Sequence, residues 1–280
     1  MEGGDSMTRL NENDISGISS GLHMYDMELK KTLGYTLEEI AKKSVKAFYS
    51  DSVYKKYTIA VIPVKSGMGI ITGFSETVSD ILKYCGTDVF VTDKTDIAGI
   101  QEAYEKNADI IFVADDETCA AFSLDKKVYS DNGYATGIAF AAALEIMMDR
   151  VEEEVLILGA GPVGIAASQY LSQIGAIPVL CDLQEDKACH AASTIINAKV
   201  EKNLKNINKY KYILDASTSG GFIKADDITE NTKISAPGIP LGVAEEIRDK
   251  VSIFHNPLEI GIMTMYFDCV NKLMEVNENE

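Results

Sequence analysis

The segment Val155–Gly164, with the sequence VLILGAGPVG, decides the fold of this chain of 280 residues. It starts as a short apolar run, which predicts a buried strand, and ends in the pattern G-x-G-x-x-G at the start of a helix. Gly159 would allow a tight turn, Gly161 would let the backbone approach a pyrophosphate, and Gly164 would let helix and strand pack closely. Free N–H groups and the helix dipole favour phosphate binding there. The segment therefore predicts a Rossmann dinucleotide-binding domain.

An acidic residue after the next predicted strand indicates which dinucleotide binds. Asp182 follows the strand 177–181, about twenty residues beyond the glycine pattern, where a carboxylate can accept hydrogen bonds from the ribose hydroxyls of NAD and would repel the 2′-phosphate of NADP. We therefore expect an NAD-binding site. The alternative is a glycine-rich turn without a ligand, followed by an aspartate on the surface. The end of a later strand, Asp215–Thr218, is either a further contact or an ordinary loop. The predicted cofactor-binding residues are Gly159, Gly161, Pro162, Val163, Gly164, Asp182, Leu183, Ala216, Ser217 and Pro237.

Composition and charge exclude several classes of protein. The 43 acidic and 26 basic residues give a net charge of −17, which argues against nucleic acid or an anionic membrane surface as the main partner. The start of the chain lacks a signal-peptide pattern, and the longest apolar run, 135–148, is too short to span a bilayer. Five cysteines without a C-x-x-C pair indicate reduced thiols in a cytoplasmic protein. No cluster has metal-ligand spacing, so we expect no metal.

Alternating strand and helix patterns predict an α/β protein of two domains. The first, 1–150, is a substrate domain with an N-terminal helical region over 8–48, including a capping box at Thr36 and Glu39, and parallel β-α-β units. The second, 151–280, is the Rossmann domain, with a C-terminal helix that can pack back on the first. Strands are expected at 57–64, 88–92, 109–114, 155–158, 177–181, 212–214, 233–235 and 251–254. Helices are expected at 74–85, 97–106, 135–150, 162–174, 186–196 and 262–276, and a polar turn at 126–134.

A glycine-rich loop follows the first predicted strand. Residues 65–75 read KSGMGIITGFS. Backbone amides and the hydroxyls of Ser66 and Ser75 could hold a carboxylate at the start of the following helix. The same glycines are also compatible with simple turn chemistry.

Two adjacent aspartates, Asp115 and Asp116, close the predicted strand at 109–114. Ligands of open α/β sheets bind at the carboxyl ends of strands, so the pair could bind an ammonium group or share a proton and act as a base. Alternatively, Asp116 caps a following helix and Asp115 faces water. His255, in a turn after the strand 251–254, is a weaker catalytic candidate, and the other histidines are expected on the surface.

Four short blocks, in order along the chain, resemble the pyrrolysine synthase family. Residues 61–76, VIPVKSGMGIITGFSE, are similar to that family's first-domain loop, and 114–118, ADDET, to its ADDNT. Residues 235–240, SAPGIP, are similar to its STPGIP, and 256–261, NPLEIG, to its EPLGIG. The nucleotide fingerprint lies between the second and third blocks. The resemblance covers residues 57–266 and, more weakly, the N-terminal helix.

The resemblance implies an NAD-dependent oxidation of a primary amine in pyrrolysine biosynthesis. The family's substrate is a small molecule, L-lysine that carries 3-methyl-D-ornithine on its ε-nitrogen. The terminal amine of the ornithine part loses hydride to NAD, the imine is hydrolysed with release of ammonia, and the aldehyde closes the pyrroline ring with loss of water. A long dicationic substrate suits an acidic cleft. A homodimer is compatible with the sequence.

By position, the resemblance implies that Ser66 lies at the substrate and that Asp115 holds or deprotonates the reacting amine. Leu10, in the N-terminal helix, would close over the substrate. Asn256 departs from the pattern, because the family has a glutamate there and an amide takes up no proton. Glu259, in place of a glycine, could supply that carboxylate. The predicted catalytic residues are Asp115, Ser66, Glu259 and Asn256, and the predicted substrate-binding residues are Leu10, Ser66, Gly67, Ser75 and Asp116.

Two other functions are compatible with these residues. The chain could be another two-domain dehydrogenase that resembles shikimate or methylenetetrahydrofolate dehydrogenase. Such enzymes depend on a lysine of the first domain, for which Lys65 is the candidate at a strand end. The chain could also be a sensor that binds NAD without turnover. An activity assay distinguishes the three hypotheses.

Overall fold

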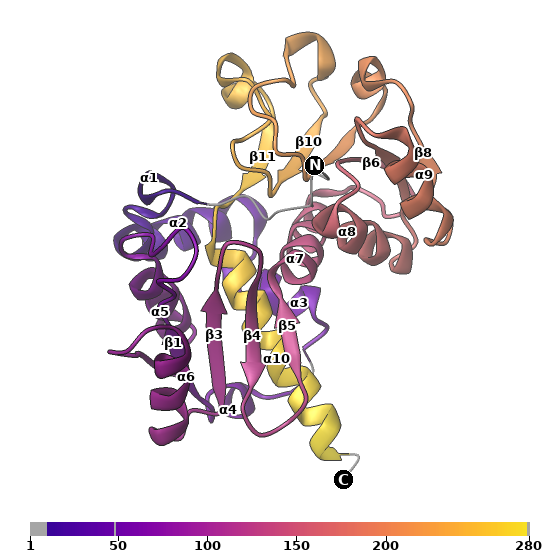
Figure 1. Ribbon diagram of the computed structural model, residues 1–280. Helices are drawn as coiled ribbons and strands as arrows, with labels where there is room; N and C mark the ends of the chain where they lie inside the picture. The colour runs from indigo at the N-terminus through magenta and orange to yellow at the C-terminus, as the bar shows by residue number, and fades with distance from the viewer. Residues whose placement is uncertain (1–9, 48, 279–280) are drawn as a thin grey trace. The chain divides into compact units, whose positions relative to one another are not determined.

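The computed structural model describes residues 10–47 and 49–278, which divide into two compact units (Figure 1). One unit contains the described residues up to Ala135 together with those from Leu258 onward, and the other spans Thr136–Pro257. The sequence predicted a single boundary near residue 150. In the structure, the chain passes from one unit to the other twice, after Ala135 and after Pro257, because the last helix belongs with the first unit. Among the described residues, no helix combines the length and apolar character needed to cross a bilayer.

The first unit is built on a five-stranded sheet with the order β2-β1-β3-β4-β5. β1, β2 and β3 are parallel, whereas β4 runs antiparallel to β3, and β5 antiparallel to β4. The strands are β1 (Thr58–Ile62), β2 (Asp88–Val91), β3 (Ile110–Ala114), β4 (Cys119–Ser123) and β5 (Tyr129–Asp131). The helices are α1 (Glu12–Ile15), α2 (Ile18–Leu33), α3 (Leu37–Ser44), α4 (Asp51–Tyr54), α5 (Phe74–Tyr84), α6 (Asp96–Glu105) and α10 (Glu259–Glu278).

The antiparallel strands correct the sequence prediction for this unit. The expected sheet was parallel, with a polar turn at 126–134 and no strand between 114 and 135. β4 begins with the small residues CAA, which have little strand propensity, and β5 is only three residues long. Both strands form because each pairs with the preceding strand across a short hairpin. A local sequence pattern does not reveal such pairing between two segments.

Helices cover both faces of this sheet. Ala60 and Ile62 of β1 pack in one cluster with Ala103 of α6. α5 packs against β1 and β2, and α10 packs against β4, β5, α3 and α5. The C-terminal helix therefore completes the core of the first unit, as the sequence analysis allowed. The capping box at the start of α3 is confirmed, since the Thr36 hydroxyl accepts from the backbone N–H of Glu39, whose carboxylate accepts from the backbone of Thr36.

The second unit is a six-stranded, fully parallel sheet with the order β11-β10-β9-β6-β7-β8. Counted from β6, this is the order 3-2-1-4-5-6 of a Rossmann domain, which confirms the predicted fold class. The strands are β6 (Glu154–Leu158), β7 (Ile177–Cys181), β8 (Lys199–Val200), β9 (Tyr212–Asp215), β10 (Lys233–Ala236) and β11 (Ser252–His255). The helices are α7 (Asn132–Met147), α8 (Pro162–Gln173) and α9 (Glu185–Ser193), with short 3-10 helices at Leu204–Lys209, Ala225–Asp227 and Glu245–Lys250.

The core of the second unit lies on both faces of its sheet. On one face, Leu156 and Leu158 of β6 cluster with Ile213 and other buried side chains. α7 is fixed to the strands by a hydrogen bond of 2.7 Å from the Ser235 hydroxyl to the carbonyl of Phe140. All five cysteines of the chain are free thiols, and four of them are buried, as predicted.

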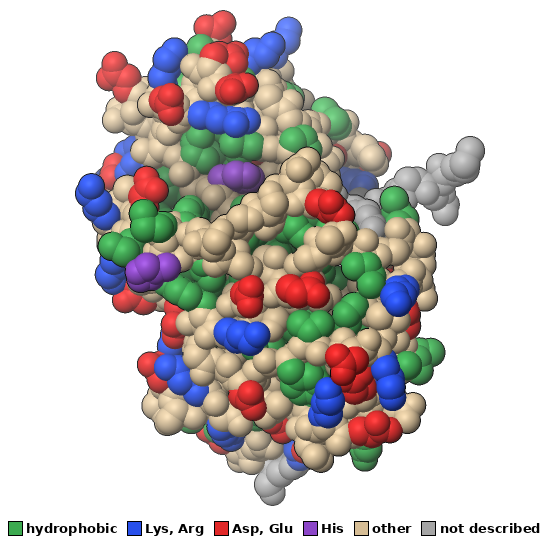
Figure 2. Space-filling model, turned by 90° about the vertical axis from the view of Figure 1, so that its left-hand side faces the viewer, with side chains coloured by type: hydrophobic (Ala, Val, Ile, Leu, Met, Phe, Trp, Pro, Cys, Tyr) green, Lys and Arg blue, Asp and Glu red, His purple; other side chains and the backbone are tan. Residues whose placement is uncertain are grey.

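The face drawn in Figure 2 mixes charges of both signs. Figure 2 turns toward the viewer the side of Figure 1 on which α1, α5 and α6 lie, and shows acidic and basic side chains interspersed with small groups of hydrophobic ones. Such a mixture is typical of a solvated surface.

α7 and α8 approach so closely that a side chain at Gly137 has no room. A Cβ there would lie 2.4 Å from the carbonyl oxygen of Val163 and 2.7 Å from the Cβ of Ala166. We predict that Gly137→Ala lowers the free energy of unfolding by about 1–3 kcal/mol, because the two helices must move apart. Urea unfolding followed by circular dichroism measures this change.

Gly21→Ala is the matched control, because Gly21 lies within α2 and a Cβ there would have no heavy atom within 4 Å. This variant should be neutral or more stable by about 0.5–1 kcal/mol, since alanine favours the helix. Equal stability of the Gly137 variant and the parent would contradict the close crossing.

Candidate functional site

The turn after β6 has the geometry of a dinucleotide-binding loop. Gly159 has a φ of +97°, which favours glycine, and its N–H donates to the carbonyl of Cys181 at 2.9 Å. A Cβ at Gly164 would lie 2.0 Å from the carbonyl oxygen of Gly159, so only glycine fits. A Cβ at Gly161 would have no heavy atom within 4 Å, and the space beside this residue is therefore open. Pro162 and Val163 follow as the first residues of α8.

This turn lies where the order of the sheet reverses. β6 pairs with β7 on one side and with β9 on the other, and the register places Leu158 opposite Asp215. In doubly wound sheets, a ligand binds outside the carboxyl ends of the strands at this switch point. The predicted residues Ala216 and Ser217 directly follow β9, and Pro237 follows β10.

Asp182, at the end of β7, is fixed by the backbone around it. Its Oδ2 accepts from the N–H of Ala160 and its Oδ1 from the N–H of Gln184, both at 2.8 Å. Each carboxylate oxygen has a second lone pair, so the side chain keeps acceptor capacity for a ribose. The neighbouring Leu183 is 89% exposed. Asp182 thus ties the glycine turn to the loop after β7.

Asp215, the last residue of β9, is a fully buried carboxylate that the sequence analysis treated only as part of a loop. Its Oδ1 accepts from the backbone N–H of Ser217 at 3.1 Å and from the Ser217 hydroxyl at 2.7 Å. Burial raises the pKa of this carboxyl to about 6, although the bonds from Ser217 favour the ionised form. A Cβ at Gly242 would lie 2.0 Å from Oδ2, so the loop after β10 closes over it. The spacing Asp-x-Ser could have indicated this arrangement, because an aspartate side chain often accepts a hydrogen bond from the backbone two residues further along.

In the first unit, the glycine-rich loop is held by two carboxylates. Oδ1 of Asp96 accepts from the N–H groups of Lys65 and Ser66 at 3.1 and 3.0 Å, and Oδ2 of Asp116 accepts from the N–H of Met68 at 2.7 Å. The sequence left open whether the backbone amides of this loop hold a carboxylate of a ligand or only form a turn. The N–H groups of Lys65, Ser66 and Met68 bind acidic side chains of the chain itself. A Cβ at Gly67 would lie 2.1 Å from Oδ2 of Asp116, which explains the glycine.

The aspartate pair has divided roles. Asp115 is exposed, and its Oδ1 accepts from the N–H groups of Glu117 at 2.9 Å and Thr118 at 2.7 Å, which forms the turn into β4. Oδ2 of Asp115 takes part in neither bond. The alternative in which Asp116 caps a following helix is wrong, since β4 follows and Asp116 binds the glycine-rich loop instead.

The other predicted site residues are spread over the two units. Ser66 is exposed on the loop, whereas Ser75 is buried in the first turn of α5. Leu10 directly precedes the cap of α1 and is half-buried, rather than lying within the helix as expected. Asn256 is buried near the end of the second unit, and Glu259 is buried at the start of α10 in the first. Their functional roles stay predictions.

His255 ends β11, and its Nδ1 lies 2.7 Å from the carbonyl oxygen of Ala236. Burial lowers the pKa of this imidazole, which favours the neutral ring. This contact ties the imidazole to the backbone of β10, and the catalytic role of His255 stays a prediction.

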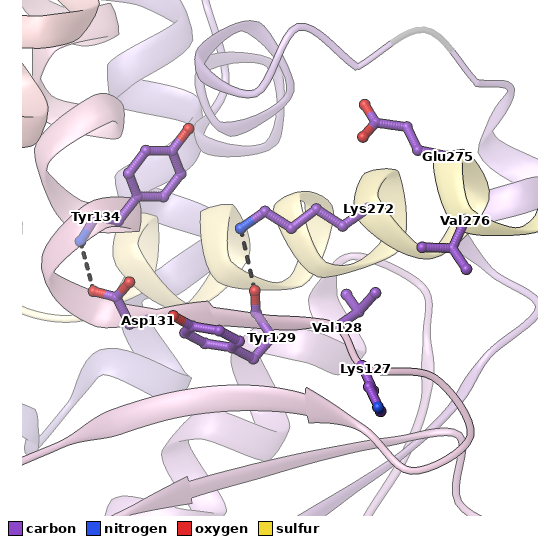
Figure 3. Close-up of a pocket in the computed structure, with 8 residues that line it drawn as sticks. All are labelled: Lys127, Val128, Tyr129, Asp131, Tyr134, Lys272, Glu275 and Val276. Carbon is purple, nitrogen blue, oxygen red and sulfur yellow. Dashed lines mark hydrogen bonds between the residues drawn. The ribbon is translucent and has the colours of Figure 1, made fainter. Parts of the chain in front are cut away.

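A separate pocket lies between β5 and α10 (Figure 3). Lys272 of α10 points into it and donates to the carbonyl of Tyr129 at 3.1 Å and to Asp268 at 2.6 Å. Because β4 and β5 are antiparallel, residues 127–129 lie at the opposite end of the sheet from the Asp115 turn. The lining contains none of the predicted site residues. It consists of Lys127, Val128, Tyr129, Asp131, Tyr134, Lys272, Glu275 and Val276.

Comparison with known sequences matches this chain to one family of proteins. Residues 14–130 match the family described as "Pyrrolysine biosynthesis protein PylD, N-terminal domain". The chain is 31% identical to pyrrolysine synthase of Methanosarcina barkeri over 263 residues, which cover 93% of this chain and 97% of that protein. It is 30% identical to pyrrolysine synthase of Methanosarcina acetivorans, with 93% and 99% of the two chains covered.

Solved structures share the fold at low sequence identity. Shikimate dehydrogenase from Aquifex aeolicus aligns with a TM-score of 0.52 at 14% identity, over 78% of this chain and 91% of that one. Quinate dehydrogenase from Corynebacterium glutamicum, solved in complex with NAD, aligns with a TM-score of 0.53 at 10% identity, over 81% and 100% of the two chains. Both alignments show that this chain shares its fold with these two proteins.

The buried Asp215 makes a testable contribution to stability. The carboxyl ionises near pH 4 in an unfolded chain but near pH 6 in the folded protein, so the folded state binds the proton more tightly. The unfolding free energy should fall as pH rises from about 4 to about 6, by roughly 3 kcal/mol at most. We predict that Asp215→Asn is more stable than the parent at pH 7.5 and loses this advantage at pH 4, as measured by thermal unfolding.

The exposed Asp226 of the same unit provides the control variant Asp226→Asn, which should leave the unfolding free energy within about 0.5 kcal/mol of the parent value. A stability difference between Asp215→Asn and the parent that does not change between the two pH values would show that Asp215 is not the group that titrates.

Proposed function

Because the chain belongs to the pyrrolysine synthase family, we propose that it uses NAD to oxidise the terminal amine of L-lysine-Nε-3-methyl-D-ornithine and yields the pyrroline ring of L-pyrrolysine. One observation carries the proposal: the likeness to pyrrolysine synthases extends over 93% of the chain and so includes both units. We place the protein in the cytoplasm, in keeping with its five free thiols.

The residues of the second unit fit a nicotinamide dinucleotide. The open space beside Gly161 and the start of α8 would accommodate the pyrophosphate, and the loop from Ala216 would adjoin the sugar. When bound, the dinucleotide would supply the hydride acceptor. NAD is favoured over NADP because the fixed carboxylate of Asp182 would bind a ribose diol and repel a phosphate.

In the first unit, Asp115 is our candidate for the group that handles the reacting amine. An ammonium group cannot release hydride, so the nitrogen must first lose a proton. The turn formed by Glu117 and Thr118 fixes Oδ1 of Asp115, and Oδ2 is the atom we assign to the amine. Asp115 would bind the substrate as an ammonium and accept its proton. The carbon then loses hydride, which leaves an iminium ion.

The remaining steps require that water reach the reacting carbon only after hydride transfer. Bulk water should be excluded until hydride has left, and one water then adds to the iminium carbon and releases ammonium. The resulting aldehyde condenses with the neighbouring amine of the same molecule, which forms the ring C=N bond and releases water. Leu10, half-buried ahead of α1, is our candidate for a cover over the substrate, and Asn256 and Glu259 for the second polar group at the site.

The proposal predicts NADH formation when the purified protein is mixed with the lysine–methylornithine dipeptide and NAD. Asp115→Asn should keep the turn, because the amide oxygen still accepts from the backbone, but should lower kcat about 100-fold or more through loss of the proton acceptor. Asp125→Asn, an exposed residue in the turn beyond β4, is the matched control and should retain the parent rate.

The outcomes separate the proposal from its alternatives. Formation of NADPH from shikimate and NADP, without reaction of the dipeptide, would indicate a shikimate dehydrogenase-like enzyme. Binding of NAD without turnover of either substrate would indicate a sensor. Full activity of Asp115→Asn with the dipeptide would leave the reaction in place and contradict the role of Asp115.

A second prediction concerns the choice of cofactor. Asp182→Ala should weaken NAD binding about tenfold or more through loss of the ribose contacts, and should reduce the preference for NAD over NADP because the repulsion is removed. Titration of both dinucleotides by calorimetry measures the two constants. Unchanged affinity for both would show that Asp182 does not contact the ribose.

A further inference from the structure

The side chain of Asp215 binds the turn that directly follows its own strand. Its Oδ1 accepts two hydrogen bonds from Ser217, one from the backbone N–H and one from the hydroxyl, while Oδ2 is buried against Gly242. Because burial raises the pKa of this carboxyl to about 6, the group is ionised at pH 7.5 and binds Ser217 as a charged acceptor. Hydrogen bonds to a charged acceptor are roughly twice as strong as those between neutral groups. Asp215 therefore holds Ser217 firmly at the end of β9.

The turn that Asp215 holds is in contact with the first glycine of the dinucleotide-binding loop. The N–H of Ala216 donates to the carbonyl of Leu158 at 2.8 Å. A Cβ at Gly159 would lie 2.8 Å from the carbonyl oxygen of Ala216 and 3.3 Å from the nitrogen of Ser217. Backbones packed this closely transmit each other's displacements. A movement of Ser217 would therefore change the loop in which a pyrophosphate is expected to bind.

The loop after β10 packs against the same turn. The N–H of Gly238 donates to the carbonyl of Asp215 at 3.1 Å. A Cβ at Gly238 would lie 2.3 Å from the carbonyl oxygen of Ser217, so this loop also lies directly on the turn. The backbone of Ser217 thus contacts Gly159 through its nitrogen and Gly238 through its carbonyl oxygen. The position of this one residue sets how the loops after β6, β9 and β10 fit together.

Loss of the carboxylate would leave both donors of Ser217 without their acceptor. A half-buried N–H and hydroxyl that lose a partner carry a cost in free energy, which the turn can reduce only by changing its conformation or by admitting water. Either change displaces Ala216 and Ser217 from Gly159. The carboxylate of Asp215 is thus required for the observed position of the turn, although it is fully buried itself.

We propose that Asp215 is a positioning residue of the dinucleotide site, which holds the turn of Ala216 and Ser217 against Gly159 before the cofactor binds and thereby raises the affinity for it. A turn that is already ordered loses less conformational entropy when the ligand binds. The inference rests on one part of the proposed function, the binding of a nicotinamide dinucleotide at Gly159–Gly164, and deepens it. Asp215 acts through Ser217 and needs no contact with the dinucleotide.

The affinity of Asp215 variants for NADH should follow the acceptor that each variant retains. Asp215→Val fills the buried space without an acceptor, and its Kd should rise about tenfold, as should that of Asp215→Ala. Asp215→Asn keeps an acceptor oxygen for Ser217, so its Kd should stay within about threefold of the parent value. Titrations followed by NADH fluorescence measure these constants, and thermal unfolding shows that each variant is folded.

Asp149→Ala is the matched control, because it removes another hydrogen-bonded carboxylate of the same unit. Asp149 accepts from Lys233 at 2.9 Å at the start of β10, and the parallel strands place this contact at the opposite edge of the sheet from Ser217. Its variant should leave the Kd for NADH unchanged.

A double variant tests the route through Ser217. Ser217→Ala loses the hydroxyl bond but keeps the bond from the backbone N–H, and its Kd should rise about threefold. Asp215→Val combined with Ser217→Ala should bind NADH as Asp215→Val does alone, because the two changes remove the same interaction. With the dipeptide, the KM for NAD of Asp215→Val should rise about tenfold, whereas kcat at saturating NAD stays within about threefold.

Failure of the inference differs from failure of the proposed function. An unchanged Kd in folded Asp215→Val overturns the inference, as do an Asp215→Asn variant that is equally impaired and fully additive effects in the double variant. Should neither the valine nor the alanine variant fold, an unchanged Kd in Ser217→Ala overturns it. A parent that binds NADH but does not oxidise the dipeptide contradicts the proposed reaction alone. A parent that binds no dinucleotide contradicts both.

Discussion

Carboxylates that bind backbone N–H groups hold the loops at the ends of the parallel strands in both units. Asp96 and Asp116 do so for the glycine-rich loop, and Asp182 and Asp215 for the loops after β7 and β9. N–H groups beyond a strand end have no partner in the sheet, and a charged acceptor binds them more strongly than a neutral one. The arrangement of each candidate site therefore depends on a few short acidic side chains.

The second unit could be predicted closely because its determinants are local. The strand, the turn and the helix start between Val155 and Gly164 are adjacent in sequence, and each glycine has a steric reason within the same segment. Asp182 follows at the spacing that the βαβ unit dictates. Alternation of strands with helices then implies a parallel sheet, and the observed strand order agrees. Patterns of this kind need no knowledge of distant contacts.

Features that depend on distant partners could not be predicted. β4 and β5 have weak strand patterns and form through pairing, and Asp116 binds Met68, which lies far away in the sequence. The sequence showed that Asp115 and Asp116 are adjacent, but not that one forms a turn and the other holds a loop. Similarly, a carboxylate at Asp215 reads as an exposed loop residue until the segment around Gly242 is known to cover it.

The packing of α10 has a consequence for how the protein is made. This helix contacts α3, α5, β4 and β5, yet it follows the whole of the second unit in the sequence. During synthesis, the Rossmann unit therefore leaves the ribosome complete while the first unit still exposes the surface that α10 covers. Closure of so long a chain segment delays assembly of that core. Until α10 emerges, β4 and β5 of the nascent chain lack the helix that covers them and are exposed to aggregation.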